Sequence, residues 1–483
     1  MAFKKVGKII ATASAALMAV AAGELVAGTQ FGGLITQYFT AAARKPIDTS
    51  EFKEAAAASD DLCRQIGDEG IVMLKNLNNA LPLKGDKKIN LLGWNATDAG
   101  FHFCGIGSGS STIQEEKRKT LIDAFKEEGW EVNQDILDYY YNYDHTERGY
   151  GTGSDARVSL IQPFVNEAVN GVVLEDLLDE AMDFSDTALI VISRIGGENV
   201  GEIPLTQPKS KTGHTRDDTR NYLDLSTEEE QLIEAAEERF DHVILLINST
   251  NQMQLGRIRD DDGIEAILNC SITGQSATFG VPHLLQGYHT VTSEVDGVET
   301  EVEEKISPSG RLTDTWATDY TKSPAFANYI RQGNHIDYGE DIYFGYRYYE
   351  TAAAEGYIRY GDEVVFPFGY GLSYTSFEWS EFTFSETETG FDCAVTVMNI
   401  GTRPGKDVVE LFLSKPYEAG GVEKAAVELV GLAKTGTLEQ GASETVVIHT
   451  DRQALASYDT YGEGTYVADA GKYLEEAIAS EDS

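Results

Sequence analysis

Short apolar runs that end at turn residues alternate with helical patterns over the first three quarters of the chain. The clearest run, Thr187–Ile192, is rich in β-branched residues and too short for a buried helix. It therefore predicts an interior strand of a parallel sheet. The strand is followed by Gly196, Gly197 and Glu198, a glycine pair that lets the backbone turn and a carboxylate at its rim. Open α/β sheets present functional groups at the carboxyl ends of strands, so this segment is a candidate site.

The neighbouring segments predict the rest of this layer. Ser226 and Glu229 form a capping box, which predicts a helix from there to about Phe240. The other predicted elements are a helix over about 54–69, a strand over 89–92, a helix over 119–129, and strands over 242–248 and 263–268. Alternation of strand and helix predicts a mainly parallel sheet covered by helices on both faces.

The pattern changes after Ser373. From Phe377 to about Gly471 the helical spacing disappears, and short alternating runs such as Asp392–Met398 are separated by turn residues. Runs of this kind predict an antiparallel β-sandwich of immunoglobulin-like type with about 100 residues. The expected fold class is therefore α/β, a mainly parallel-sheet sandwich, followed by an all-β sandwich.

The amino-acid composition limits the classes of molecule that the chain can bind. Asp and Glu number 79 against 38 Lys and Arg, which gives a formal net charge of −41. This charge repels nucleic acid and anionic membrane surfaces and suits a neutral substrate. Hydrophobic residues make up 42% of the chain, an ordinary share for a globular protein.

The pattern of cysteines and histidines predicts no metal site. Cys63, Cys104, Cys270 and Cys393 lie far apart, and the eight histidines show no ligand spacing such as H-E-x-x-H. We expect isolated buried thiols, no metal and no cofactor.

The amino terminus resembles a secretory signal. Lys4, Lys5 and Lys8 precede Ile9–Ala22, a stretch without charge that is shorter than the roughly 20 residues of a spanning helix. Apolar residues resume after Glu24, so both a cleaved signal and an uncleaved membrane anchor are open. We expect export to the extracellular face rather than residence in the cytoplasm.

Two other segments have alternative interpretations. The Gly-rich loop Gly105–Ser111 lacks the spacing of a phosphate-binding motif, so a flexible loop beside a site is favoured over a phosphate cradle. The aromatic tract Tyr343–Tyr349 is either a surface on which sugars stack or packing in the core and between domains, and packing is favoured.

Several segments, taken in their order along the chain, form a recognisable set. They are Glu69–Asn76, Ala80–Leu83, Ile192–Glu198, Ser307–Leu312, Gly345–Tyr349, Phe366–Thr375, Val422–Lys424 and Glu428–Gly431. Together they resemble glycoside hydrolase family 3, the family of β-glucosidases and related exo-acting enzymes. After residue 420 the likeness is to the family's fibronectin-III-like domain. The domains this implies are a signal or anchor over 1–30, a linker over 31–55, the α/β-sandwich domain over 56–375, the fibronectin-III-like domain over 376–472 and a tail over 473–483.

The resemblance implies retaining hydrolysis of a terminal β-linked sugar, with a β-linked oligosaccharide or glucoside as the partner. In the family an Asp on a (β/α)₈ barrel is the nucleophile, and a Glu on the α/β-sandwich domain is the acid/base. Glu198 matches that acid/base. A carboxyl near apolar walls and opposite another carboxylate has a raised pKa, which suits protonation of the leaving oxygen. The alternative for Glu198 is a solvated loop residue.

The sequence departs from the family in three places. Gly and Asp usually follow the acid/base, whereas Asn199–Glu202 stands here, which makes Glu202 a rival. The stretch Cys270–Ile306 lacks the family's usual helix pattern, which puts one element of the sheet in doubt. The flanks are also far shorter than the roughly 250 residues of a barrel. Some members place the sandwich before the barrel, so the expectation is a product truncated near residue 483.

Two functions from different classes follow. The first is a β-glucosidase-like chain that contributes Glu198 and is inactive alone. The second is a non-catalytic carbohydrate-binding or scaffolding protein at the cell surface. Glu198 is also expected to lie close to the loop Gly105–Ser111, because both follow strands of one parallel sheet. The sequence leaves the sugar, the linkage and the oligomeric state open.

Overall fold

The computed structural model describes residues 49–105, 117–143, 160, 162–196, 220–249, 251–295, 298–328 and 335–478. The chain divides into one unit up to Asp61 and a second from Leu62 to Ser483. The helices of the described residues are α2 (Ser50–Gly70), α3 (Leu121–Glu127), α4 (Gln134–Tyr141), α5 (Leu174–Phe184), α6 (Thr227–Glu237), α7 (Gly280–Gln286), α8 (Pro324–Asn328), α9 (Tyr346–Ala354) and α10 (Tyr360–Glu363). The helix α2 begins at Ser50, within the last part of the expected linker over 31–55.

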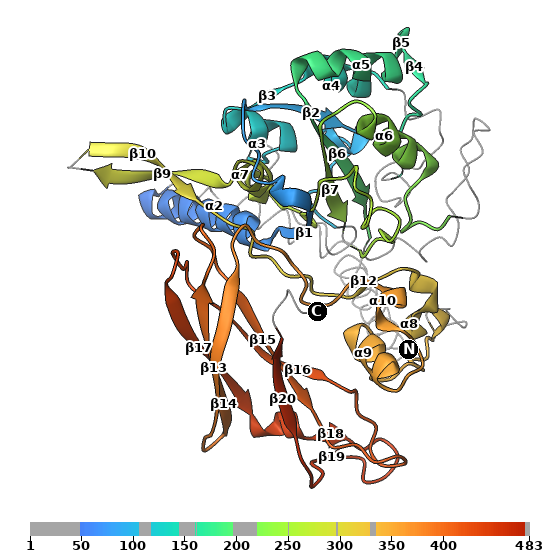
Figure 1. The fold of residues 1–483 in the computed structure, drawn as a ribbon, viewed down its shortest axis with the longest axis vertical. Helices are drawn as coiled ribbons and strands as arrows, with labels where there is room; N and C mark the ends of the chain where they lie inside the picture. Colours follow the sequence, from blue (N-terminus) through green and yellow to red (C-terminus); the bar gives the residue numbers. More distant parts are fainter. Residues whose placement is uncertain are drawn as a thin grey trace, which may run out of the picture. The chain divides into compact units, whose positions relative to one another are not determined.

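A six-stranded sheet forms the core of the α/β part of the second unit (Figure 1). Its order is β1 (Val72–Asn76), β8 (Ala266–Asn269), β7 (His242–Ser249), β6 (Thr187–Arg194), β2 (Lys88–Leu92) and β3 (Glu131–Val132). The pairs from β8 to β3 are parallel, and β1 joins β8 antiparallel at the edge. The mainly parallel sheet is thus confirmed, and β6 is an interior strand between β7 and β2.

Burial on both faces explains the unbroken apolar runs of the central strands. Along β6 the side chains of Ala188, Ile190 and Ile192 belong to one hydrophobic cluster, which also takes in α4, α5 and α6. Leu189 and Val191 point to the other face and pack in a cluster with α3 and α7. Because successive strand residues face opposite layers, every residue of β6 is buried.

The atypical stretch between Cys270 and Ile306 forms elements that the sequence pattern did not predict. After β8 the chain makes the short helix α7, which ends at Gly287 with a left-handed φ of 75°. Two long antiparallel strands follow, β9 (Tyr288–Val295) and β10 (Val298–Lys305) (Figure 1). Smaller pairs elsewhere are β4 (Ala168–Val169) with β5 (Val172–Val173), and β11 (Trp316–Ala317) with β12 (Val364–Phe366).

The C-terminal part is a β-sandwich of two three-stranded sheets, as expected. One sheet contains β13 (Phe377–Glu386), β14 (Gly390–Asn399) and β17 (Ser443–Asp451); the other contains β16 (Glu428–Lys434), β15 (Val408–Ser414) and β20 (Leu474–Ile478). The short strands β18 (Ser457–Tyr458) and β19 (Tyr466–Val467) pair with each other. Within the segment 473–483, which we expected to be a tail, Leu474–Ile478 pairs with β15.

The predicted signal or anchor over residues 1–30 lies outside the described residues. Among the helices that the structure describes, none combines the length and apolar character needed to cross a membrane.

Candidate functional site

One amide side chain, that of Asn248, connects several segments at the carboxyl edge of the parallel strands through hydrogen bonds. Asn248, near the end of β7, accepts hydrogen bonds at Oδ1 from the Ser193 hydroxyl (2.9 Å) and the His102 backbone N–H (2.7 Å). Its Nδ2 donates to the carbonyls of His102 (2.9 Å) and Ser271 (2.6 Å). Ser193 lies on β6, His102 follows β2 and Ser271 follows β8. Asn248 thus connects the end of β6 and the end of β7 with the segments that follow β2 and β8.

The last residue of β6, Arg194, is fixed by a second network. Its side chain is completely buried and forms an ion pair with Glu229, whose side chain is 2% exposed. The guanidinium donates to both carboxylate oxygens of Glu229, at 2.8 and 2.6 Å. It also donates to the carbonyls of Tyr222 (2.7 Å) and Asp224 (2.7 Å). Every direction of the guanidinium fork is therefore used, and the strand end cannot shift without breaking these bonds.

Glu229 and Tyr222 connect this anchor to the surrounding chain. The Glu229 carboxylate also accepts from the Ser226 backbone N–H (2.7 Å), so the predicted capping box of α6 is present and holds the partner of Arg194. The Tyr222 hydroxyl accepts from the N–H of Ile195 (3.0 Å) and donates to its carbonyl (2.9 Å). The backbone is thus held one residue beyond β6.

The two candidate acid/base residues, Glu198 and Glu202, lie outside the described residues, which stop at Gly196 and resume at Arg220. Of the loop Gly105–Ser111, only Gly105 is described. The expected closeness of Glu198 to that loop stays a prediction. What the structure brings together are the residues just before each segment, since Ser193 and His102 both bind Asn248.

The ring of His102 has a nitrogen atom that makes no hydrogen bond with the described residues. Its Nε2 is buried and has no hydrogen-bond partner among the described residues. Burial lowers the pKa of His102 to about 4, so the ring is neutral at physiological pH. Neither its burial nor its place beside β7 was visible in the sequence.

A polar hollow of about 540 Å³ lies beside the first described residues after Gly196, which begin at Arg220. We call it the polar hollow; it is lined by Asn221, Asp224, Gln254, Gly256, Arg257, Thr318, Asp319 and Thr321. Burial raises the pKa of Asp224, although Arg257 and Arg220 act in the opposite direction. The backbone carbonyl of Asp224 also accepts from Arg194, which fixes the backbone that carries this carboxyl to the end of β6. No sequence motif marked it.

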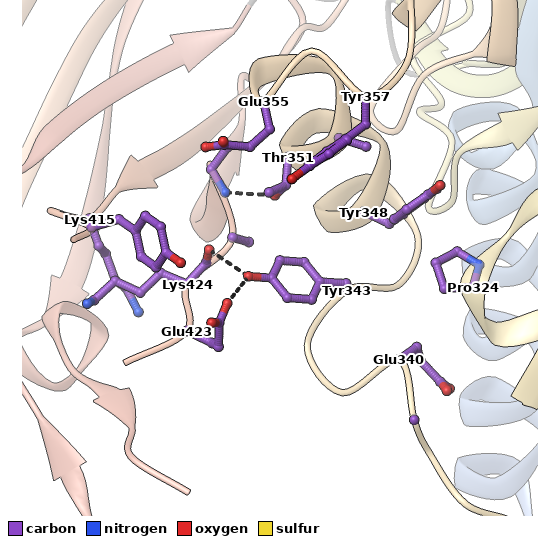
Figure 2. A pocket seen from close by; sticks show the side chains of 15 residues that line it. Pro324, Glu340, Tyr343, Tyr348, Thr351, Glu355, Tyr357, Lys415, Glu423 and Lys424 are labelled. Atoms are coloured by element: carbon purple, nitrogen blue, oxygen red, sulfur yellow. Dashed lines mark hydrogen bonds between the residues drawn. The ribbon is translucent and has the colours of Figure 1, made fainter. Parts of the chain in front are cut away.

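A second hollow, of about 510 Å³, contains part of the aromatic tract (Figure 2). We call it the tyrosine hollow; its main side chains are Tyr343, Tyr348, Tyr357, Tyr417, Glu340, Glu355 and Glu423. Figure 2 shows the Tyr343 hydroxyl directed at Glu423, to which it donates over 2.5 Å.

The two interpretations of the tract Tyr343–Tyr349 apply to different residues. Tyr349 is 4% exposed and belongs to a small hydrophobic cluster. Tyr346 packs against Phe368 and Phe412, with ring centroids at 4.8 and 5.8 Å. Tyr343 and Tyr348 line the tyrosine hollow instead. The tract therefore combines packing with an aromatic surface.

In the described part of the chain, one group of three side chains could hold a metal ion. It consists of Asp68, His283 and His289, whose ligand atoms all lie within 4.8 Å of one another. Asp68 is 215 residues from His283 in the sequence, which is why no motif predicted the group.

Comparison with known families gives two matches. Residues 71–374 match the glycosyl hydrolase family 3 C-terminal domain, and residues 407–474 match a fibronectin type III-like domain. Both agree with the resemblance found in the sequence.

Relatives along most of the chain are β-glucosidases. The β-glucosidase A of Butyrivibrio fibrisolvens is 28% identical over 434 residues, which are 84% of this chain and 48% of that protein. A β-glucosidase of Ruminococcus albus is 31% identical over 435 residues, 88% of this chain and 39% of that protein. The chain thus spans about half or less of the length of these relatives.

Solved structures of β-glucosidases share the fold. The enzyme of Paenibacillus barengoltzii has a TM-score of 0.68 and 27% identity, and the match covers 87% of this chain and 42% of that one. β-Glucosidase 3B of Thermotoga neapolitana, solved with α-D-glucose, has a TM-score of 0.64 and 28% identity, covering 86% and 53% of the two chains.

Proposed function

The chain belongs to glycoside hydrolase family 3, and from this premise we propose that it carries the acid/base part of a β-glucosidase-like active site. The proposed reaction is retaining hydrolysis of terminal, non-reducing β-D-glucosyl residues. Glu198 is the proposed acid/base, and the nucleophilic carboxylate is supplied by a (β/α)₈ barrel domain outside the matched residues. The substrate class rests on the β-glucosidases to which the chain is similar.

The observation that carries this proposal is the fixed end of β6. Asn248 binds the Ser193 side chain, Arg194 is paired with Glu229, and the Tyr222 hydroxyl holds the backbone of Ile195, three residues before Glu198. A general acid must be held near the bond that it protonates, and such positioning costs less when the supporting chain is already ordered. A loop carboxylate that is only solvated would not require a buried guanidinium at the end of the strand from which its loop leaves.

The proposed chemistry divides the reaction into two steps. In the first, the protonated carboxyl of Glu198 gives its proton to the glycosidic oxygen while the nucleophile attacks the anomeric carbon and forms a covalent glycosyl-enzyme. In the second, the Glu198 carboxylate takes a proton from water, which attacks the same carbon and releases the sugar.

The two carboxyl groups of a retaining enzyme stand about 5–5.5 Å apart. Because the chain is assigned only the acid/base, we propose that its 483 residues alone hydrolyse aryl β-glucosides at no more than the background rate.

The experiment compares the purified chain with the same chain fused at its carboxyl end to a barrel domain from an active family 3 β-glucosidase. The measured quantity is turnover of aryl β-glucosides. The proposal expects activity only in the fusion, and a fusion whose barrel nucleophile is replaced by Gly is the matched control. Robust turnover by the unfused chain would show that both carboxylates lie within it.

The second candidate function, carbohydrate binding without catalysis, is favoured by the tyrosine hollow. Binding sites for sugars combine aromatic faces with fixed polar groups, and this hollow offers Tyr348 and Tyr357 beside Glu355 (Figure 2). Its volume of about 510 Å³ lies within the usual range of small-molecule sites.

Titration of the unfused chain with cellobiose, followed by NMR of the ligand, tests this candidate. Binding that is lost in Tyr348→Ala and Tyr357→Ala but kept in the control Tyr461→Ala would support it; Tyr461 is 89% exposed and lies in the β-sandwich. Absence of binding at millimolar sugar would remove it.

A further inference from the structure

Two histidine rings converge on one buried carboxylate at the junction of α2, α7 and β9. The Nδ1 atom of His283 lies 2.6 Å from Oδ1 of Asp68. The Nδ1 atom of His289 lies 2.8 Å from Oδ2 of the same carboxylate. The side chains of Asp68 and His283 are 8% and 7% exposed, whereas that of His289 is 25% exposed and opens the group to solvent.

The outer nitrogen of each ring also faces a carboxylate. Nε2 of His283 lies 3.1 Å from Oε1 of Glu128. Nε2 of His289 lies 3.6 Å from Oε2 of Glu304, a residue of β10. Glu128 is itself held, because Gln286 donates to its other oxygen over 3.2 Å. Histidines that bind metals almost always donate their second ring N–H to an outer carboxylate or carbonyl. Glu128 lies at that distance from His283, whereas the 3.6 Å between His289 and Glu304 is the distance of an ion pair.

The number of protons that an imidazole ring can carry limits the explanations of this arrangement. A neutral imidazole carries one N–H, but here both nitrogens of both rings face carboxylate oxygens. Either each ring is doubly protonated, or a cation replaces the two inner protons. We propose that Asp68, His283 and His289 bind a divalent zinc ion through Oδ and the two Nδ1 atoms, with Glu128 and Glu304 as positioning residues. On binding, each ring releases its Nδ1 proton to solvent and keeps the Nε2 proton.

Zinc is the cation that this ligand set suits. Two imidazoles and one carboxylate provide three protein ligands of a tetrahedral site and leave the fourth position to water. Bonds of about 2.0–2.2 Å separate neighbouring ligand atoms by roughly 3.3 Å. The Nδ1 atoms lie 2.6 and 2.8 Å from the Asp68 oxygens, and all three ligand atoms lie within 4.8 Å of one another, so side-chain movements on the order of an ångström make room for the ion. Neither the polar hollow nor the tyrosine hollow includes these residues, so the proposed ion lies apart from both.

The fold brings the three ligands together through glycines. A Cβ added at Gly280 would come within 2.5 Å of the Gly67 carbonyl carbon, so α7 approaches α2 as closely as it does because both positions lack side chains. That approach places His283 of α7 beside Asp68 of α2. Gly287, with its left-handed φ of 75°, then turns the chain into β9 and returns His289 to the same carboxylate.

The test uses the full chain, stripped of metal by chelator, and Zn²⁺ alone as the probe. Calorimetric titration is expected to give one Zn²⁺ per chain, and the melting temperature is expected to rise with zinc concentration. Co²⁺ in place of zinc is expected to give the intense visible absorption of a tetrahedral site. His283→Gln and His289→Gln should lose stoichiometric binding, and Glu304→Gln should weaken it by about 10- to 100-fold.

His242→Gln is the matched control, because Nδ1 of His242 also lies close to a carboxylate, Glu265, at 2.5 Å, but without the second ring. It should bind zinc as the unchanged chain does. If His283→Gln does not fold, judged by circular dichroism, the more exposed His289 and Glu304 carry the test. Absence of one-to-one zinc binding in the stripped chain, or binding retained in His289→Gln, would overturn the proposal and leave a pair of protonated histidines.

Discussion

The guanidinium of Arg194 and the carboxylate of Glu229 form a bidentate ion pair that is almost completely shielded from water. The two N–O distances are 2.8 and 2.6 Å, and the side chains are 0% and 2% exposed. Glu229 also caps α6, and Arg194 ends β6, so this contact fixes the helix to the strand that leads to Glu198. The candidate site therefore depends on residues that take no part in chemistry themselves.

Replacement of Arg194 by Ala is expected to lower the free energy of unfolding by about 3–5 kcal/mol, because it leaves the Glu229 carboxylate buried without its positively charged partner. Urea denaturation measures the loss. The double variant Arg194→Met with Glu229→Leu should lose less than the sum of the single changes, since no lone charge is buried. Arg452→Ala, which removes an exposed pair with Glu386, is the control and should change stability by less than about 1 kcal/mol.

Asn248→Ala is expected to cost about 2–4 kcal/mol of stability, because the change leaves the buried Ser193 hydroxyl and two carbonyls without their partner. Hydrogen exchange at the His102 amide should also become faster, since Asn248 accepts from that N–H. Asn142→Ala removes only one exposed contact at the end of α4 and serves as the control. Unchanged exchange at His102 would contradict the role given to Asn248.

The contact of Glu69 with the β-sandwich predicts a loss of stability in acid. Burial alone would raise the pKa of Glu69, but hydrogen bonds from Lys406, Gln65 and Lys434 outweigh it and lower the pKa to about 2. A folded-state pKa below the ordinary 4.5 means that the contribution is complete above pH 4.5 and disappears as the pH falls towards 2.

The measurement is the urea midpoint as a function of pH for the unchanged chain and for Glu69→Gln. The two midpoints should differ at pH 6 and converge as the pH falls from about 4.5 towards 2. Glu386→Gln, which affects an exposed pair, should show no such convergence. A difference that persists at pH 2 would mean that Glu69 acts through packing rather than charge.

Much of the α/β layer was predictable because its strands are buried on both faces. Thr187–Arg194 and His242–Ser249 carry apolar residues on every side, and this signal is nearly independent of the rest of the chain. The capping box at Ser226 was also local, since its two partners are three residues apart. Elements of this kind can be read from a short window of sequence.

The parts that were missed depend on contacts between distant residues. Asp68 meets His283 across 215 residues, and Arg194 meets Glu229 across 35, so no motif could indicate either pair. The strands β9 and β10 were not predicted because their sequence is mostly polar and lacks the apolar face that packs on a core. The pairing of Leu474–Ile478 with β15 was likewise not predicted, because it is set by tertiary contact rather than by turn residues.

The most direct test of the central claim is the dependence of turnover on the leaving group in the barrel fusion, measured for Glu198→Gln and Glu202→Gln. An acid/base is needed most when the leaving group is a poor one, because that oxygen must be protonated as the bond breaks. Our account predicts that Glu198→Gln loses activity on aryl glucosides with poor leaving groups, keeps it on activated ones and is rescued by azide, whereas Glu202→Gln behaves like the unchanged fusion. The same pattern in Glu202→Gln, with Glu198→Gln unaffected, would contradict it.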